Sequence, residues 1–349
     1  MSQSPFGTLD EPGSGWVPFA NRALEPIRWI ARALWTEVFG FRFGYPIELV
    51  PEAGPRDSLH YYVFSERLFF DAMQLDEHGV PVQRSRTLGV FYNPAYVAWY
   101  GLMALEQSLR HGGIGAERFQ IQVAWLLKNA VRQADGAIVW SFPVDVQEGK
   151  CRLKAPWVSA MIQGLAISML VRANRQGWKS DELIDICRAA VKVYRKNVCD
   201  GGVRTFEQGG TLYEEYPAYP LPRVMDGFLF SLLGLYDFWI ETGEAEAKEL
   251  FEEGVQGLLN YLSVWNYRDR WSWYGSHGYL CPPQYHVLNR LLVGTLARVT
   301  GEQVLTRYAA LWDPARLNTY ERARLFLVFM VLKQRARIRA VGRSHERTQ

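Results

Sequence analysis

Two adjacent carboxylates and three tyrosines stand in one short stretch of the chain, from Tyr213 to Tyr219. Three prolines, Pro217, Pro220 and Pro222, keep this stretch out of the helix that the apolar residues after it predict. The stretch therefore lies at the entrance of that helix, where backbone N–H groups point outward and favour negative charge. Carboxyl and phenol groups held in such a place suit general acid and base chemistry. An ordinary solvated turn is the structural alternative.

Further polar residues that do not suit an apolar core gather near predicted helix entrances. They are Glu214, Glu215, Tyr216, Arg223 and Asp226 at one entrance, and Tyr274, His277, Tyr285 and His286 around the next. Each has a structural alternative, because a tyrosine at a helix start is commonly a packing residue, and Tyr285 and His286 could cap their own helix. The convergence of separate parts of the chain on one rim favours a functional site.

The elements that must position these residues repeat along the chain. Gly101, Gly164 and Gly227 are 63 residues apart, each inside an apolar helix that follows a proline. A fourth apolar helix surrounds Arg290 to Leu296. More charged helices are predicted after the first three, over residues 116–134, 180–198 and 244–265. This repeat predicts a mainly α protein, an α/α toroid of about four helical hairpins whose apolar helices form the inner ring and share one N-terminal end.

Three regions follow from this pattern. Residues 1–92 contain a loose tail, an amphipathic helix from Pro26 to Phe43 and a short β-hairpin whose turn includes His78 and Gly79. Residues 93–315 form the α/α barrel, and residues 316–349 form a further helix with a basic tail. The first helix packs on the protein's own core, joins a dimer contact or docks on a membrane surface.

The composition indicates which kind of molecule the protein binds. The aromatic content of 14% is high, and aromatic faces beyond the need of a core often line sugar-binding sites. A net charge of +3 gives no reason to expect a nucleic acid, and a slight basic excess suits an anionic substrate.

The cysteines and the N-terminus indicate in which cellular compartment the protein is expected. The four cysteines are widely spaced and include no C-x-x-C pair, so neither a disulfide framework nor a zinc site is indicated. No signal peptide or membrane-spanning run is apparent, and we therefore expect a cytoplasmic protein, with contact at a membrane surface left open.

Several stretches of the chain together resemble the D-glucuronyl C5-epimerases, which invert glucuronate to iduronate in heparan-sulfate-type polysaccharides. The stretches run from Tyr92-Asn-Pro94 to Tyr100-Gly-Leu102, from Pro156-Trp-Val to Ile167-Ser168, over Tyr213-Glu-Glu-Tyr-Pro217, from Gly227 to Asp237, over Trp271-Ser-Trp-Tyr274 and over Gln284-Tyr-His286. The resemblance covers roughly residues 80 to 313.

The resemblance implies an α/α barrel that acts on a glucuronate-containing glycan such as heparosan and pairs as a homodimer. For this chain we expect no cofactor and no metal. Its proposed acid and base residues carry over to Glu215, Tyr216, Tyr274 and Tyr285. Residues predicted to contact the substrate are Glu214, Tyr213, Arg223, Asp226, His277, His286, Arg290, Trp157, Gln163, Tyr92 and Asn93.

Two departures from the family pattern matter for the chemistry. Gly275, Ser276 and His277 follow Tyr274, so the Asp and Arg of the family motif are missing, and Asp226 stands where the animal enzymes have Asn. Without that Arg, we expect Arg223 to bind the substrate carboxylate, with His277 or Arg290 as alternatives.

The reaction itself sets requirements that the residues can meet. Inversion at C5 removes a proton next to a carboxylate, and Glu215 suits the base if burial raises its pKa. A polysaccharide lyase shares this first step, and a non-catalytic glycan-binding protein is the alternative of another class.

Overall fold

The computed structural model describes residues 35, 38, 41–65, 73–85, 88–178 and 180–345. The predicted helix from Pro26 to Phe43 lies mostly outside these residues, although Trp35 and Val38 are helical. Phe41 and Phe43 are not helical, so the prediction placed the end of this helix too late. Both rings pack against Trp271 instead, at centroid distances of 6.4 and 5.9 Å.

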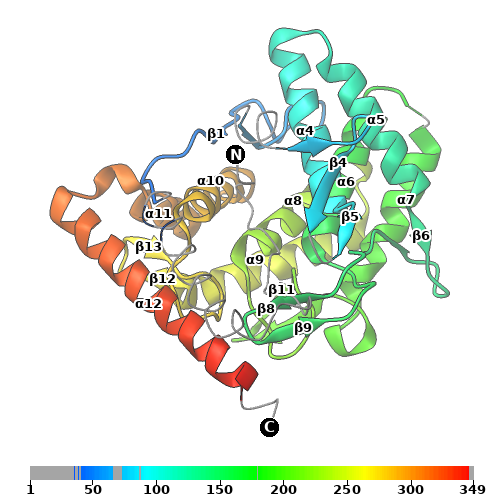
Figure 1. Cartoon of the computed structure of the whole chain (residues 1–349). Helices are drawn as coiled ribbons and strands as arrows, with labels where there is room; N and C mark the ends of the chain where they lie inside the picture. Colours follow the sequence, from blue (N-terminus) through cyan, green and yellow to red (C-terminus); the bar gives the residue numbers. More distant parts are fainter. Residues whose placement is uncertain are drawn as a thin grey trace.

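Helices dominate the described residues, which confirms a mainly α architecture (Figure 1). They form consecutive pairs: α4 (Pro94–His111) with α5 (Gly115–Lys128), α6 (Ala160–Arg175) with α7 (Ser180–Val191), α8 (Met225–Thr242) with α9 (Ala245–Trp265), and α10 (Pro283–Thr300) with α11 (Gln303–Leu311). Helix α6 packs between α4 and α8, and α8 also contacts α10. This order agrees with the predicted inner ring, while closure into a toroid stays a prediction.

The first helix of each pair is mostly buried, and the second is amphipathic. In α8 every residue from Met225 to Leu235 is buried, since α6, α9, α10 and strand β11 pack against it. In α9 the buried residues, from Ala247 through Leu250 and Gly254 to Leu258, recur at intervals of three and four. Within the described residues, none of these helices combines the length and the apolarity that crossing a bilayer requires.

Small antiparallel hairpins connect one helical pair to the next. They are β6 (Val131–Arg132) with β7 (Ile138–Val139), β8 (Val146–Glu148) with β9 (Cys151–Leu153), β10 (Arg204–Glu207) with β11 (Gly210–Tyr213), and β12 (Asn266–Tyr267) with β13 (Trp271–Ser272). Each lies before the first helix of a pair. The hairpins therefore present their residues near the N-terminal ends of α6, α8 and α10.

The N-terminal strands agree with the predicted hairpin. Strand β1 (Glu48–Leu49) pairs with β2 (Val63–Phe64), and β3 (Gln74–Leu75) pairs with β4 (Pro81–Ser85), which also pairs with β5 (Gly89–Phe91). The turn between β3 and β4 contains His78 and Gly79, as predicted.

Two helix ends differ from the prediction. Helix α5 ends at Lys128 and not at residue 134, because Val131 and Arg132 pair with β7 across a turn at Asp135 and Gly136. The Asp135 side chain accepts a hydrogen bond from Ala137 N, which fixes this turn. Helix α7 likewise ends at Val191, where 3₁₀ turns replace the predicted last turns of helix.

Helix α12 (Thr319–His345), red in Figure 1, lies beside β12 and β13. Its Leu325 and Phe329 belong to a small second core with Trp271 and Leu280. This second core holds the β12–β13 hairpin, and therefore the residues that follow it, in place.

Helices α6 and α8 cross at a pair of glycines. A Cβ on Gly164 would lie 2.5 Å from Phe230 O, and a Cβ on Gly234 would lie 2.4 Å from Gly164 O. No side chain fits at such distances, so the two backbones approach each other as closely as glycine allows.

We expect Gly164→Ala or Gly234→Ala to lower the free energy of unfolding by about 1–3 kcal/mol, because the added methyl group overpacks this crossing. Urea denaturation measures the change. Gly294→Ala in α10 is the matched control, since its Cβ would meet only Ala309 Cβ, at 3.6 Å. This control should gain up to about 1 kcal/mol from better helix propensity. Equal stability of all three variants would contradict the crossing.

Candidate functional site

The acidic stretch lies between β11 and α8, as expected of a helix entrance. Glu214 O accepts a hydrogen bond from Ala160 N at 3.1 Å, which joins the stretch to the start of α6. The Glu215 side chain lies across Gly227 in the first turn of α8, where an added Cβ would be 2.4 Å from Oε2. Glycine at position 227 therefore makes room for the Glu215 carboxyl group.

Tyr216 and two tyrosines from other segments lie near Glu215. A side-chain hydrogen bond joins Tyr216 to Glu215, and the Tyr216 ring lies 5.7 Å from the ring of Trp157. Tyr274 follows β13, and Tyr285 lies in the first turn of α10, with their ring centroids 5.7 Å apart. Glu215 is close enough to Tyr285 to raise its pKa. The structure thus brings all four predicted acid and base residues together, while their roles stay predictions.

The loop after Tyr274 is fastened to the segment before α8. Ser276 N donates to Pro222 O at 2.6 Å, and Ser276 Oγ donates to Leu221 O at 2.8 Å. Gly275 has φ of +56° and lies against Pro222 O, where a Cβ would approach within 2.1 Å. Backbone contacts therefore hold Tyr274 and the acidic stretch in a fixed relation.

Glu148, at the end of β8, is a member of the cluster that the sequence did not indicate. Its Oε1 lies 2.7 Å from His277 Nε2, and the His277 side chain is only 3% exposed. His277 Nδ1 lies 2.6 Å from Tyr274 O, and because a carbonyl only accepts, we assign a hydrogen to Nδ1. The imidazole ring centroid also lies 4.8 Å from that of Tyr274. A carboxylate in a hairpin turn carries no pattern that would have revealed this pairing.

Tyr96 is a second residue that the sequence did not indicate. It lies in the first turn of α4, and its phenol is close enough to Tyr285 to raise the pKa of Tyr285. The N-terminal turns of α4, α8 and α10 therefore face the same cluster.

The pKa values in the cluster shift in one direction. Burial raises the pKa of Glu215 well above its ordinary value, and the nearby Asp226 carboxyl adds to this shift. Burial also raises the pKa of Tyr216, Tyr274 and Tyr285 well above that of an ordinary tyrosine. The phenols are thus held neutral, and the Glu215 carboxyl keeps its proton to a higher pH than an exposed glutamate does.

Asp226 lies beside Glu215 in the first turn of α8. It is 4% exposed, and its own N–H and that of Gly227 bond to its carboxyl group. Burial raises its pKa to about 7, with the charge of Glu148 as a further cause. Its Oδ1 has no hydrogen-bond partner among the described residues. Asp226 therefore belongs to the cluster, as predicted from its position.

Arg223 has other partners than the sequence led us to expect. Its Nη1 donates to Glu214 Oε1 and to Thr205 Oγ1, each at 2.6 Å, and its Nη2 pairs with Glu207. The side chains of Arg223 and Glu214 are 9% and 2% exposed. Both terminal nitrogens are thus engaged in a buried network, and we do not include Arg223 among the groups that face a substrate.

Other predicted contact residues lie outside the cluster. They are Tyr213, Tyr92, Asn93, Gln163, His286 and Arg290. Tyr213 is buried in β11 and donates to Leu250 O at 2.7 Å. Asn93 caps α4, and Tyr92 donates to Asp76 at 2.8 Å. Each side chain therefore has a structural partner within the fold.

The remaining three predicted contact residues lie in helices α6 and α10. Gln163 is fully buried and donates to Ile138 O at 2.9 Å. Burial lowers the pKa of His286 to about 3, and its Nδ1 lies 2.9 Å from Ser272 Oγ. Arg290 pairs with Asp313 at 2.6 Å. A sequence shows that such residues stand near a helix entrance but not which way they point.

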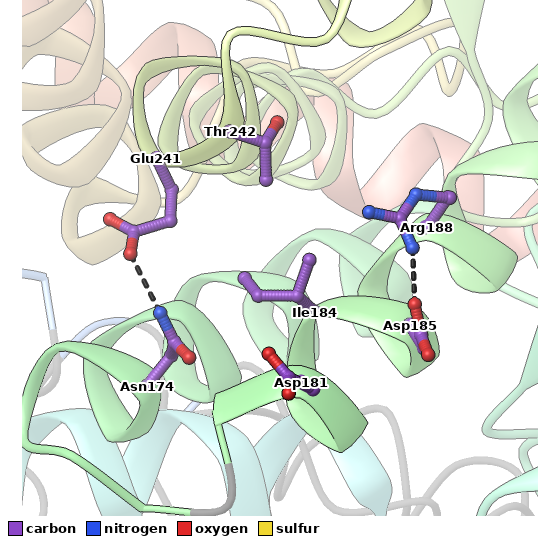
Figure 2. A pocket seen from close by; sticks show the side chains of 7 residues that line it. All are labelled: Asn174, Asp181, Ile184, Asp185, Arg188, Glu241 and Thr242. Carbon is purple, nitrogen blue, oxygen red and sulfur yellow. Dashed lines mark hydrogen bonds and ion pairs between the residues drawn. The ribbon is translucent and has the colours of Figure 1, made fainter.

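A hollow of about 400 Å³ lies away from this cluster (Figure 2). It is bounded by Asn174, Asp181, Ile184, Asp185, Arg188, Glu241 and Thr242. Asn174 and Glu241 belong to the C-terminal ends of α6 and α8, whereas Glu215 meets the N-terminal ends. In Figure 2 Asn174 donates to Glu241 and Arg188 pairs with Asp185, so polar groups in the hollow bind one another.

Comparison with known proteins points to one family. A family model described as "D-glucuronyl C5-epimerase C-terminus" matches residues 134–314. The chain is 33% identical over 214 residues to a D-glucuronyl C5-epimerase of Caenorhabditis elegans, and the match covers 56% of this chain and 34% of that protein. It is 25% identical over 212 residues to an uncharacterized protein of Methanocaldococcus jannaschii, with 56% of this chain and 68% of that protein covered. The chain thus spans about a third of the length of the worm protein.

We expect Arg223→Met to lower the free energy of unfolding by about 3–5 kcal/mol, because it leaves the buried Glu214 carboxylate unpaired. Denaturation by urea measures this loss. The double variant Glu214→Gln, Arg223→Met should regain most of it, since no buried charge remains.

Arg270→Met is the matched control, because the Arg270 side chain is 50% exposed where it pairs with Glu321. Little change in stability is expected there. If Arg223→Met were as stable as the control, the buried pairing of Arg223 with Glu214 would be refuted.

Proposed function

The chain belongs to the D-glucuronyl C5-epimerase family, and from this membership we propose that it inverts C5 of D-glucuronate residues in a polysaccharide. The product of this reaction is iduronate. The observation that carries the proposal is the meeting of Glu215 with Tyr216, Tyr274 and Tyr285 at one end of the helices. Heparosan is our proposed type of substrate.

In this proposal Glu215 removes the proton from C5. The electron pair of the broken C–H bond moves into the carboxyl group of the sugar, which becomes an enediolate. Tyr274 or Tyr285 then returns a proton to the other face of C5. Burial keeps these phenols neutral and able to donate, and the fraction of Glu215 in the ionised, proton-accepting form increases as the pH rises.

In this proposal the basic side chain near the reacting carboxyl group is His277 and not Arg223. Both terminal nitrogens of Arg223 are engaged with other side chains, whereas the imidazole of His277 lies next to Tyr274. Glu148 Oε1 lies 2.7 Å from Nε2 and holds the imidazole beside the cluster. His277 follows Tyr274 at the place of the missing family Arg.

Association and location belong to the same proposal. We propose a homodimer that acts in the cytoplasm on an anionic glycan, with contact at a membrane surface as a further option. Light scattering of the full chain and of a chain that begins at residue 46 tests whether the N-terminal segment contributes to the dimer.

The reaction is tested by solvent exchange. Incubated with heparosan or a glucuronan in deuterated water, the protein is expected to place deuterium at C5, because the proton that returns comes from exchangeable phenols. Nuclear magnetic resonance detects the label and the new iduronate signals. Label without elimination supports the epimerase. Ultraviolet absorbance from an unsaturated uronate would instead identify a lyase, and binding without label would indicate a glycan-binding protein.

The roles of two residues are tested by conservative substitution. We expect Glu215→Gln and Tyr285→Phe each to lower turnover by about 10²–10⁴-fold, the usual contribution of a group that transfers a proton. Tyr308→Phe, in α11, is the matched control and should retain turnover, because its ring packs against Trp312 away from the cluster. Wild-type rates in both cluster variants would remove these residues from the mechanism.

A further inference from the structure

The cluster contains more acid than base. Glu148, Glu215 and Asp226 contribute three carboxyl groups, and the pKa shifts show that they act on one another. His277 lies against Glu148, and Arg223 is paired with carboxylates of its own network. A bound glucuronate would add a fourth carboxyl group. An anion brought into such surroundings without a hydrogen-bond donor would lose its hydration uncompensated.

Two carboxyl oxygens of the cluster lack the partner that buried polar atoms normally have. Asp226 Oδ1 and Glu215 Oε2 are both buried, and neither has a hydrogen-bond partner among the described residues. Glu215 Oε2 lies against Gly227, the residue after Asp226. An orphaned buried oxygen costs free energy unless it is protonated or meets a ligand.

The neighbours of Asp226 disfavour its ionised form. The titratable groups that face it are Glu215 before α8, Glu148 from β8, Tyr274 and Cys281 around the β12–β13 hairpin, and Tyr285 from α10. None of these supplies a positive charge. Lys333 of α12 lies over the ring of Tyr279, at 5.1 Å. Burial, with the charge of Glu148 as a further cause, raises the pKa of Asp226 to about 7.

We propose that Asp226 binds the substrate as a neutral carboxyl group, whose O–H donates a hydrogen bond to the carboxylate of glucuronate. This inference rests on the proposed function, because it concerns the same substrate and the same site. Asp226 would supply a hydrogen-bond donor for the substrate carboxylate, as the missing family Arg would, but without adding charge. No proton passes to the substrate in this binding step, because the hydrogen stays on Asp226.

An ionised Asp226 that accepts a hydrogen bond from a sugar hydroxyl is the competing arrangement. The two predict opposite effects of pH. A neutral donor is fully present below its pKa of about 7 and is lost above it, so affinity falls as the pH rises. An ionised acceptor forms above that value, so affinity would increase instead. The carboxyl group of glucuronate itself stays ionised throughout.

The test measures affinity in a chain that binds but does not turn over. In the Glu215→Gln background, only Asp226 of the two neighbouring carboxyl groups titrates. Calorimetry with a short heparosan oligosaccharide should give a constant affinity below pH of about 7 and a fall of about tenfold per pH unit above it. A neutral glucan oligosaccharide of equal length controls for binding that does not involve the carboxylate.

Asp226→Asn in the same background is the matched variant, because an amide keeps a donor but does not titrate. Its affinity should no longer change with pH in this range, and Asp226→Leu should bind weakly at every pH. A fall with pH that persists in the Asn variant would assign it to another group and overturn the inference, as would an affinity that rises with pH. Deuterium exchange in the wild-type chain is a separate readout, so exchange with a failed pH test rejects the role of Asp226 alone.

Discussion

The close crossing of α6 and α8 at Gly164 and Gly234 is the constraint on which the site depends. Because the backbones touch there, the N-terminal ends of the two helices stay together, and Glu214 O can accept from Ala160 N. That bond fixes the acidic stretch over both helix starts. The apolar repeat therefore does more than fill a core, since it sets the distance between the carboxyl group on α8 and the residues around the start of α6.

Buried arginines in this molecule serve the scaffold. Arg172 pairs with Asp237 at 2.7 Å between α6 and α8, with both side chains almost fully buried. Arg223 does the same for Glu214 at the entrance of α8. Removing one partner of such a pair would leave a costly buried charge, so neither guanidinium is easily spared for a ligand. For this reason the cluster around Glu215 has an excess of acid. In our proposal, groups that carry a proton therefore bind the substrate carboxylate in place of a cation.

The sequence predicted the elements better than the directions of their side chains. Regular glycines and prolines mark helix interiors and starts, so the helical pairs and the gathering of Glu215, Tyr274 and Tyr285 followed from local rules. The partners of Arg223 did not, because they depend on its left-handed backbone, with φ of +57°, and on the register of β10. Glu148 was missed because its contact with His277 joins residues that are far apart in the chain, and no spacing encodes such a contact.

The proposed chemistry requires opposite protonation states of two neighbouring carboxyl groups. Glu215 must be ionised so that it can accept a proton, while Asp226 must keep its proton. With two protons the pair has no base, and with none it has no donor, so the state with a single proton is the one that works. Burial raises the pKa of Glu215, and the repulsion between two adjacent charges adds to this shift, so the pair keeps one proton to a higher pH than exposed carboxyl groups do. A substrate carboxylate beside Asp226 draws that proton to Asp226, since the hydrogen bond requires it there. Binding of glucuronate would then itself leave Glu215 as the ionised member, ready to take the proton from C5.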